Sequence, residues 1–266
     1  MLTKQLVILG AIAILPAFAQ VSSAPTDMIR TAPRYHHPVR DLVVHGDGTA
    51  TSTNWSGYAV TGTSFTSAQG SWIVPTATCK SGDQDASFWV GIDGYTSSTV
   101  EQLGTNSNCE GATPVYQAWY EFCCIEAEII IPGLTISPGD KIVAEVTYSG
   151  TEFTLTIKDE TTGKAFRKTG TISGAERSSA EWIAEAPYDG EILPLTDFGT
   201  VLFGEDSTGV SATNYAHDST SSGAIGSFPA ADITQITKVG STSSPQTSTC
   251  TTLSSDGTSF SCTWAK

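Results

Sequence analysis

The stretch AEWIAEAP, residues 180–187, places two carboxyl groups, Glu181 and Glu185, four positions apart around a tryptophan. A carboxyl group can serve as general base and general acid in hydrolysis, although acidic residues beside a strand are usually solvated. On one extended strand the two side chains point the same way but lie about 13 Å apart, at ~3.3 Å per residue. Glycosidase carboxyl pairs lie roughly 5 to 9.5 Å apart. Chemistry here therefore requires one glutamate with a partner from another segment.

Several common hydrolase motifs are absent from the sequence. There is no G-x-S-x-G motif and no D-T-G or D-S-G triplet. His217 is the only histidine after residue 50, which leaves too few imidazoles for a His-rich zinc site and argues against a serine or cysteine triad. We expect His217 to lie in a surface loop. The acidic stretch GDQD, residues 82–85, leaves calcium binding open, but its spacing matches no EF-hand loop.

The elements that must position these residues are strands. After residue 50 short β-rich runs alternate with turn residues, and no apolar period of helical type is sustained. In EFTLTIKD, residues 152–159, apolar and polar side chains alternate, and SPGD (137–140) and DETTGK (159–164) indicate hairpins. About a dozen such strands without crossover helices predict an all-β fold, a β-sandwich of two antiparallel sheets.

Residues 1–24 combine an early lysine, a short apolar run and small residues, which predicts a secretory signal peptide. Residues 25–50 are rich in proline, arginine and histidine, and we interpret them as a pro-segment or a linker. If they are a pro-segment, their histidines charge in acid and can hold them against the acidic body. Residues 51–266 then form one β-sandwich domain, which we expect to be a monomer.

The six cysteines are expected to form disulfides, because export places them in an oxidising setting. Cys250 and Cys262 flank a stretch with Asp256-Gly257 at its centre, which predicts a bridged terminal hairpin. The pairing of Cys79, Cys109, Cys123 and Cys124 does not follow from the sequence. For the adjacent Cys123 and Cys124 we expect bonds to different partners rather than to each other.

The chain is acidic, with 13 Lys and Arg against 27 Asp and Glu. From residue 50 onward the counts are 9 and 24, a difference of −15. Such a surface repels phosphate backbones and anionic lipid, so we expect neither nucleic acid nor membrane partners. In acid the carboxylates become neutral and few cationic groups remain to repel each other. The composition suits an acidic extracellular medium, although many secreted proteins are simply acidic.

Six segments between Asn54 and Phe203, taken in order, resemble the glutamic peptidase (eqolisin) family: NWSGYAV, SWIVP, WVGIDGYTSSTVEQLGT, YQAWYEF, AEWIAEAP and DFGTVLF. The resemblance implies two antiparallel sheets of about seven strands, endopeptidase activity on proteins or peptides in acid, and no metal or cofactor. It places the catalytic pair on Gln102 and Glu185 and leaves Glu181 a structural role. It also places five residues in or beside the substrate site: Trp55, Trp89, Asp93, Trp119 and Glu121.

The implied chemistry suits a neutral amide and one carboxyl group. Glu185 would take a proton from water and return one to the leaving amine, while the Gln102 amide stabilises the oxyanion without titrating. The residues that follow WYE read FCCIE (122–126) and depart from the family pattern, so substrate specificity stays open here. The alternative class is a carbohydrate-active sandwich, either a glycosidase that uses Glu121 and Glu185 or a lectin-like binding module.

Overall fold

The computed structural model describes residues 34–124 and 126–266. The predicted signal peptide and the first part of the predicted pro-segment therefore lie outside the described residues. Within the described ranges no helix has the length and apolar character needed to cross a membrane.

The described residues form 18 strands, one short α-helix and one turn of 3-10 helix. The helical pieces are α1 (Glu205–Thr208) and the 3-10 turn Ile225–Ser227. The strands are β1 (Val43–Val44), β2 (Thr49–Ser52), β3 (Trp55–Thr61), β4 (Ser67–Ile73), β5 (Ser87–Ile92), β6 (Val100–Glu110), β7 (Thr113–Cys123), β8 (Ile129–Ile130), β9 (Lys141–Ser149), β10 (Glu152–Asp159), β11 (Ala165–Gly170), β12 (Ser179–Glu185), β13 (Thr200–Phe203), β14 (Tyr215–His217), β15 (Ser222–Ala224), β16 (Ile233–Lys238), β17 (Thr247–Cys250) and β18 (Phe260–Ala265).

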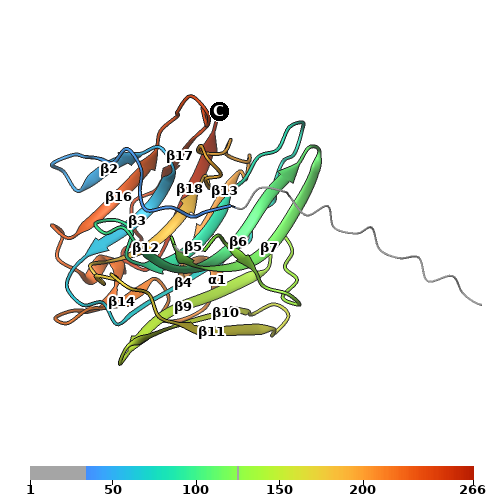
Figure 1. Ribbon diagram of the computed structural model, residues 1–266. Helices are drawn as coiled ribbons and strands as arrows, with labels where there is room; N and C mark the ends of the chain where they lie inside the picture. The colour runs from blue at the N-terminus through green and yellow to red at the C-terminus, as the bar shows by residue number, and fades with distance from the viewer. Residues whose placement is uncertain (1–33, 125) are drawn as a thin grey trace, which may run out of the picture. The chain divides into compact units, whose positions relative to one another are not determined.

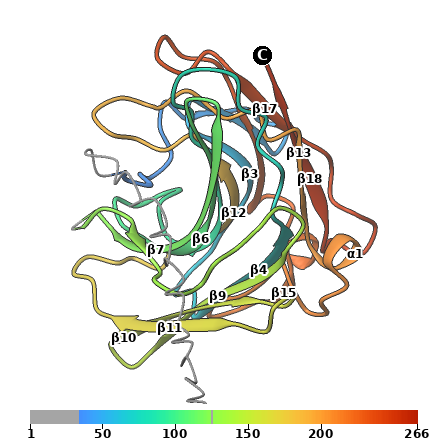
Figure 2. The same ribbon diagram turned by 90° about the vertical axis from the view of Figure 1, so that its right-hand side faces the viewer.

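The strands form two layers, as the all-β sandwich prediction requires. One layer, the curved layer, pairs β16, β3, β12, β5, β6 and β7 in that order. The other, the lower layer, pairs β11, β10, β9 and β4. Figure 1 shows the lower layer beneath the curved one, and Figure 2 shows the bend of β6 and β7. All these pairings are antiparallel, whereas β16 pairs with β2 in parallel.

The two layers are not separate sheets, and the sheet count therefore differs from the prediction. β4 pairs with β13, β13 with β18, β18 with β17, and β17 with β16. Hydrogen bonds thus run from the lower layer to the curved layer without a break among these strands. The continuity removes two exposed sheet edges at this end of the molecule.

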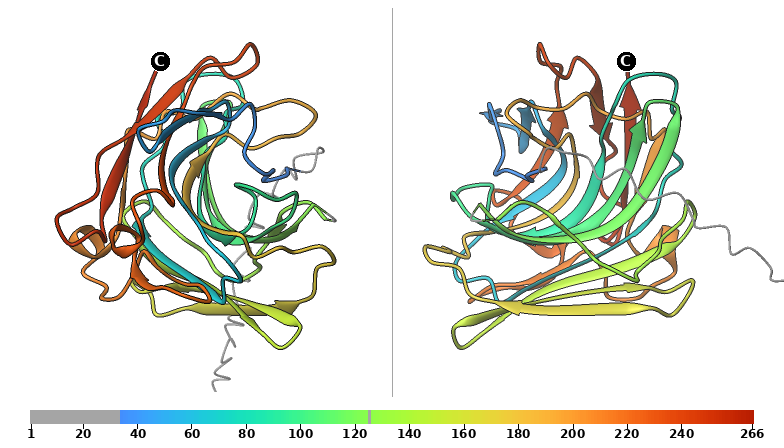
Figure 3. Two further views of the ribbon diagram at one scale, coloured as in Figure 1. Left: turned by 90° about the vertical axis from the view of Figure 1, so that its left-hand side faces the viewer. Right: turned by 45° about the vertical axis from the view of Figure 1, so that its right-hand side comes forward.

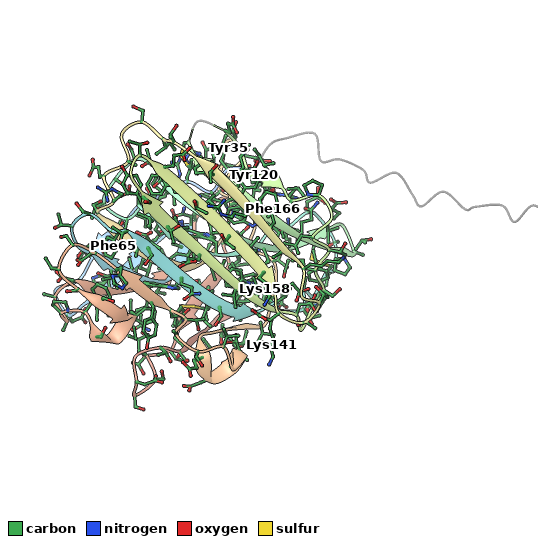
Figure 4. All side chains as sticks on the ribbon, turned by 90° about the horizontal axis from the view of Figure 1, so that it is seen from below. Tyr35, Phe65, Tyr120, Lys141, Lys158 and Phe166 are labelled. Atoms are coloured by element: carbon green, nitrogen blue, oxygen red, sulfur yellow. A yellow bond between two sulfur atoms is a disulfide. The ribbon has the colours of Figure 1, made fainter. Side chains whose placement is uncertain are left out.

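The main core lies between the layers. In β10 the side chains of Phe153, Leu155 and Ile157 are buried, while Thr154, Thr156 and Lys158 alternate with them, as the sequence predicted. Each fully buried aliphatic or aromatic side chain contributes about 1.5–3 kcal/mol relative to an exposed one. At the margin of the layers, Phe166 of β11 stacks on Tyr120 of β7 with ring centroids 5.5 Å apart (Figure 4).

A second, smaller cluster lies on the other face of the curved layer, away from the lower layer. Its buried members include Trp55, Trp89, Trp119 and Ile183. Val39, from the N-terminal part of the described chain, packs against it. In Figure 3 the start of the described chain, drawn in blue, lies beside the curved layer. The tryptophans on this face are therefore not part of the core between the two layers.

The disulfides agree with the sequence in one case and correct it in another. Cys250 and Cys262 are joined across the β17–β18 hairpin, as predicted. Cys79 pairs with Cys109, whose Cα atoms lie 5.4 Å apart, within the usual range for a bridge. Cys123 and Cys124 are joined to each other, so the expectation of different partners was wrong. The first two bridges leave these two thiols no other cysteine.

Candidate active site

Strand register brings the two predicted catalytic residues to the concave face of the curved layer. Gln102 of β6 lies opposite Glu121 of β7 and opposite Gly91 of β5. Glu185, the last residue of β12, lies opposite Trp55 of β3. Both catalytic candidates are fully buried. A glycine at position 91 is required by space, because a Cβ there would come within 2.9 Å of the Trp89 ring and 3.2 Å of Gln102 Cβ.

The carboxyl group of Glu185 has hydrogen-bond donors on both oxygens. The indole Nε1 of Trp89 donates to Oε2 at 2.8 Å, and Asn54 Nδ2 donates to Oε1 at 3.3 Å. The Nδ1 atom of His36 lies 3.3 Å from Oε2. Burial raises the pKa of Glu185 above its ordinary value, and the contacts with His36 and Trp89 oppose that rise. Glu185 is thus a buried carboxyl group whose charged form is partly supported.

The amide of Gln102 is held in one orientation. Its Nε2 donates to the backbone carbonyl oxygen of His36 at 2.7 Å and to Glu121 Oε2 at 3.3 Å. Its Oε1 is buried and has no hydrogen-bond partner among the described residues. Glu121 Oε2 also accepts from the backbone N–H of His36 at 2.9 Å. Gln102 therefore presents a donor to a peptide carbonyl and an unoccupied acceptor to the same space.

Residues 34–40 run along the concave face and bind it mainly through their backbone. Tyr35 exchanges two backbone hydrogen bonds with Tyr188, at 2.9 and 3.0 Å. The Glu128 N–H donates to the Arg34 carbonyl at 3.0 Å. The Arg40 N–H donates to Asn54 Oδ1 at 2.8 Å. We call residues 34–40 the cleft segment, because backbone pairing of this kind is how extended peptides bind to sheets and their rims.

His36 is the centre of the cleft segment and is fully buried. Its imidazole ring stacks on Trp119, with ring centroids 3.7 Å apart and planes inclined by 12°. Its Nε2 lies 2.9 Å from Glu128 Oε2, and its Nδ1 faces Glu185. Burial lowers the pKa of His36, but the hydrogen bonds and charges of Glu128 and Glu185 outweigh burial and raise it to about 10. The raised pKa favours the protonated form of the His36 imidazole, which lies between the carboxyl groups of Glu128 and Glu185.

Two more carboxyl groups complete the electrostatics of the site. Burial raises the pKa of Glu121 well above its ordinary value, although the nearby His36 opposes this. Burial also raises the pKa of Glu128, but His36, Arg34 and Asn106 together bring it below the ordinary value. Glu121 thus favours the neutral form, and Glu128 the charged form.

Of the other residues predicted to lie in or beside the site, the three tryptophans lie near Gln102 and Glu185, whereas Asp93 makes its hydrogen bonds elsewhere. Trp55 packs edge-on against Trp89, with ring centroids 5.0 Å apart, and Trp119 covers His36, so all three tryptophans surround the Gln102 and Glu185 region. Asp93 does not touch this region among the described residues. Its carboxylate accepts backbone N–H bonds from Glu176, Arg177 and Ser178 and so fixes the chain before β12.

His217 is exposed, as predicted, but it ends strand β14 rather than lying in a loop, and its ring contacts Ser222.

Among the described residues, one group has metal-ligand spacing: His37, Cys123 and Cys124. The two cysteines of this group are joined in a disulfide, whereas a metal ligand must be a thiolate.

Sequence reasoning missed three residues that contact the site directly: His36, Asn54 as a donor to Glu185, and Glu128. Glu128 lies 92 residues from His36 along the chain, in a stretch with no recognisable motif. Asn54 begins the NWSGYAV segment, and its side chain fixes the turn before β3 by accepting a hydrogen bond from Ser52. Its second role could not be found without knowing which strand β3 pairs with.

With the geometry established, comparison with known proteins identifies the family. A model of the Peptidase A4 family matches residues 53–264, which is most of the chain. The chain therefore belongs to the Peptidase A4 family, the glutamic peptidases or eqolisins, and the enzyme class is that of peptide-bond hydrolases. This finding supports a peptidase rather than the carbohydrate-active alternative.

Solved structures agree with the family assignment. Scytalido-glutamic peptidase with a transition state analog inhibitor is similar at 28% identity and a TM-score of 0.64, over 80% of this chain and 98% of that one. SCP-B, described as an eqolisin in complex with the tripeptide Ala-Ile-His, is 27% identical with a TM-score of 0.60. The match covers 80% of this chain and 98% of that one. Aspergilloglutamic peptidase from Aspergillus niger is 26% identical with a TM-score of 0.55. The match covers 68% of this chain and 99% of that one. No curated protein sequence shows a significant match.

Proposed function

We propose that this chain is a secreted endopeptidase that cleaves proteins or peptides in acid, with Gln102 and Glu185 as its catalytic pair. One observation carries the proposal: Gln102 Nε2 donates to the carbonyl oxygen of a peptide group, and Glu185 contacts the same residue, His36. A peptide bond of a substrate that followed the path of the cleft segment would thus meet both groups. The acid composition and the expected signal peptide support secretion into an acidic medium.

The reaction needs only the groups already described. Ionised Glu185 takes a proton from a water molecule, and the hydroxyl oxygen bonds to the carbonyl carbon. Gln102 Nε2 stabilises the resulting oxyanion, while Gln102 Oε1, which has no partner among the described residues, accepts a hydrogen bond from the water. The carbon–nitrogen bond then breaks, and the protonated Glu185 gives its proton to the leaving nitrogen.

The same contacts support synthesis as an inactive precursor. The imidazole of His36 lies against Glu185 Oε2, where an attacking water would have to bind. The cleft segment also occupies the hydrogen bonds of Gln102, Asn54 and Glu121. In the described state, therefore, a substrate and the cleft segment compete for one set of groups. We expect the active form to be a monomer without nucleic acid or membrane partners.

The function is tested by hydrolysis of denatured casein at about pH 4, where unperturbed carboxyl groups are half ionised. Gln102→Ala should lower kcat by roughly 10²–10³, as loss of an oxyanion donor does, and Glu185→Gln should abolish turnover. Glu181→Gln is the matched control, because it makes the same change on the same strand four residues away. Full activity of Glu185→Gln would overturn the assignment, as would cleavage of glucans but not casein.

A further inference from the structure

A cavity of about 210 Å³ lies where strand β18 ends, and the proposed reaction does not use it. Gln102 and Glu185 make their hydrogen bonds to other parts of the described chain. The walls come from the loop between β4 and β5, the loop between β12 and β13, and the chain beside β17 and β18, near the end marked C in Figure 1. The side chains that could recognise a ligand there are those of Lys80, Gln84, Asp197, Gln246, Trp264 and Lys266.

The walls of this cavity are held by bonds within the protein. The Cys79–Cys109 disulfide ties the loop between β4 and β5 to β6. The indole Nε1 of Trp264 donates to the Leu195 carbonyl oxygen at 3.2 Å, and the Leu195 N–H donates to Gln246 Oε1 at 3.1 Å. The cavity is therefore shaped before a ligand enters it, which avoids the cost of ordering loops on binding.

These bonds leave a defined set of polar groups for a ligand. Because Gln246 Oε1 already accepts a hydrogen bond, its Nε2 is left as a donor. Among the described residues Gln84 bonds through its backbone alone, so its side-chain amide can both donate and accept. Asp197 Oδ1 accepts the Gly199 N–H at 3.2 Å, and the carboxylate has further lone pairs for a hydroxyl donor. Such a mixture of donors and acceptors suits the hydroxyl groups of a sugar, since each hydroxyl both donates and accepts.

One aromatic ring and two cations define the ligand further. Trp264 is only partly buried, and its single N–H is occupied by Leu195, so its indole ring gives the cavity an apolar surface. Lys80 and Lys266 are exposed where they line the cavity. Only 9 basic residues follow residue 50 in this acidic chain, and two of them meet here. The cavity therefore combines an apolar surface, hydroxyl-binding groups and positive charge.

We propose that this cavity binds a uronic acid unit of an extracellular polysaccharide. The apolar face of the pyranose ring packs on Trp264, its hydroxyl groups bind the two amides and Asp197, and its carboxylate lies beside Lys80 and Lys266. An inorganic anion would use the lysines alone, and a neutral sugar would leave their charge unpaired. The inference goes beyond the proposed function. Binding at this cavity would hold the peptidase on a polysaccharide while its active site stays free.

The test is a calorimetric titration of the full chain at about pH 4.5, where an ordinary carboxyl group with a pKa of about 4 is mostly ionised. The ligands are trigalacturonate, the neutral trisaccharide of galactose, and inorganic phosphate. We expect trigalacturonate to bind about five- to twentyfold more tightly than the neutral sugar, because two exposed ion pairs each add a modest factor. Absence of trigalacturonate binding, equal affinity of the two sugars, or equally tight binding of phosphate would overturn the site.

Variants locate the binding. Lys80→Gln should weaken trigalacturonate binding by about two- to fivefold and leave the neutral sugar unaffected. Lys141→Gln, the matched control, alters an exposed lysine at the start of β9 and should change neither. Gln84→Ala and Trp264→Ala should weaken both sugars, and thermal melts establish that these variants fold. Unchanged affinities in Lys80→Gln and Gln84→Ala, whose side chains make no hydrogen bond among the described residues, would place the sugar elsewhere and overturn the site.

The site and the proposed function fail separately. Lys80→Gln should cleave casein as fast as the unaltered chain, and Glu185→Gln should bind trigalacturonate as tightly as the unaltered chain. If casein is not cleaved but the sugar binds, the proposed function fails and the site stands. If casein is cleaved and the sugar does not bind, only the site fails.

Discussion

Two sets of buried carboxyl groups lie in the curved layer, and they differ in the donors that surround them. Glu185 receives hydrogen bonds from Trp89 and Asn54. Glu181, on the same strand, and Glu101 of β6 have no hydrogen-bond partner on either carboxyl oxygen among the described residues. Burial, reinforced by the charge of Asp93, raises the pKa of Glu101 to about 9 and that of Glu181 well above its ordinary value.

The comparison shows how one strand can hold a reactive and an inert carboxyl group four residues apart. Burial raises the pKa of both Glu181 and Glu185. The charges of Asp93 and Glu101 raise the pKa of Glu181 further, whereas His36 and the indole N–H of Trp89 oppose the rise at Glu185. Glu181 and Glu101 remain protonated over the acid range and carry no charge to be compensated. They also make the folded state depend on acid, since an alkaline medium would ionise them in place.

The largest expected effect is on stability. The folded pKa values of Glu101 and Glu181 lie above the unfolded ones, so their protonated forms stabilise the fold fully below about pH 4.5, and this contribution is lost as pH rises. Each group then lowers the free energy of unfolding by about 1.4 kcal/mol per pH unit. Between about pH 4.5 and 7 the loss should reach several kcal/mol.

Urea denaturation across this range measures the loss. The double variant Glu101→Gln, Glu181→Gln should flatten the pH dependence, because amides do not titrate. Glu152→Gln, which changes an exposed glutamate of β10, should retain the steep dependence of the unaltered chain. If the free energy of unfolding of the double variant fell with pH as steeply as that of the unaltered chain, Glu101 and Glu181 would not be buried in the neutral form.

The sequence predicted the strands better than it predicted the environments of these buried carboxyl groups. The alternation in residues 152–159 and the Cys250–Cys262 hairpin are local patterns, and both are present. The burial of Glu181 is not local, because it depends on β3 and β5 flanking β12 on both sides. The assignment of Gln102 and Glu185 came from ordered family segments and stays a prediction of role until the variants are measured.

A second prediction concerns His36, which joins the cleft segment to Glu128 and Glu185. Because its docked pKa is about 10, its contribution to docking is fully present below the free value of 6.5 and lost as pH rises through 10. The pKa of Glu128 is lowered, so its contribution is lost as pH falls below the ordinary value. Docking is thus strongest between these limits and weakens in acid.

His36→Gln removes the cation and should let the segment leave at a higher pH. The onset of casein cleavage after a pH step should shift upward by about one pH unit. His45→Gln, which alters an exposed histidine of the same N-terminal region, should not move the onset. An unchanged onset in His36→Gln would show that the imidazole does not control docking.

The smallest effect tests the donors of Glu185 directly. Trp89→Phe removes the indole N–H that lowers the pKa of Glu185, so this pKa should rise. The acid limb of the kcat profile should move to higher pH by about 0.5–1 unit. Trp264→Phe removes a comparable donor that binds the Leu195 carbonyl, far from the site in sequence and in a different strand, and should leave the limb in place. If the acid limb of the kcat profile did not move in Trp89→Phe, the indole N–H of Trp89 would not be a donor that lowers the pKa of Glu185.

The cleft segment continues directly into β1 and β2, and β2 is a strand of the sheet through its parallel pairing with β16. The segment is therefore tethered a few residues from where it binds, and its local concentration is far above that of any peptide in solution. Because the cleft segment binds within its own chain, the fraction of sites that it occupies does not depend on protein concentration, and dilution does not release it. One cut between residue 40 and β1 would end that advantage, after which the released peptide must compete as a free ligand.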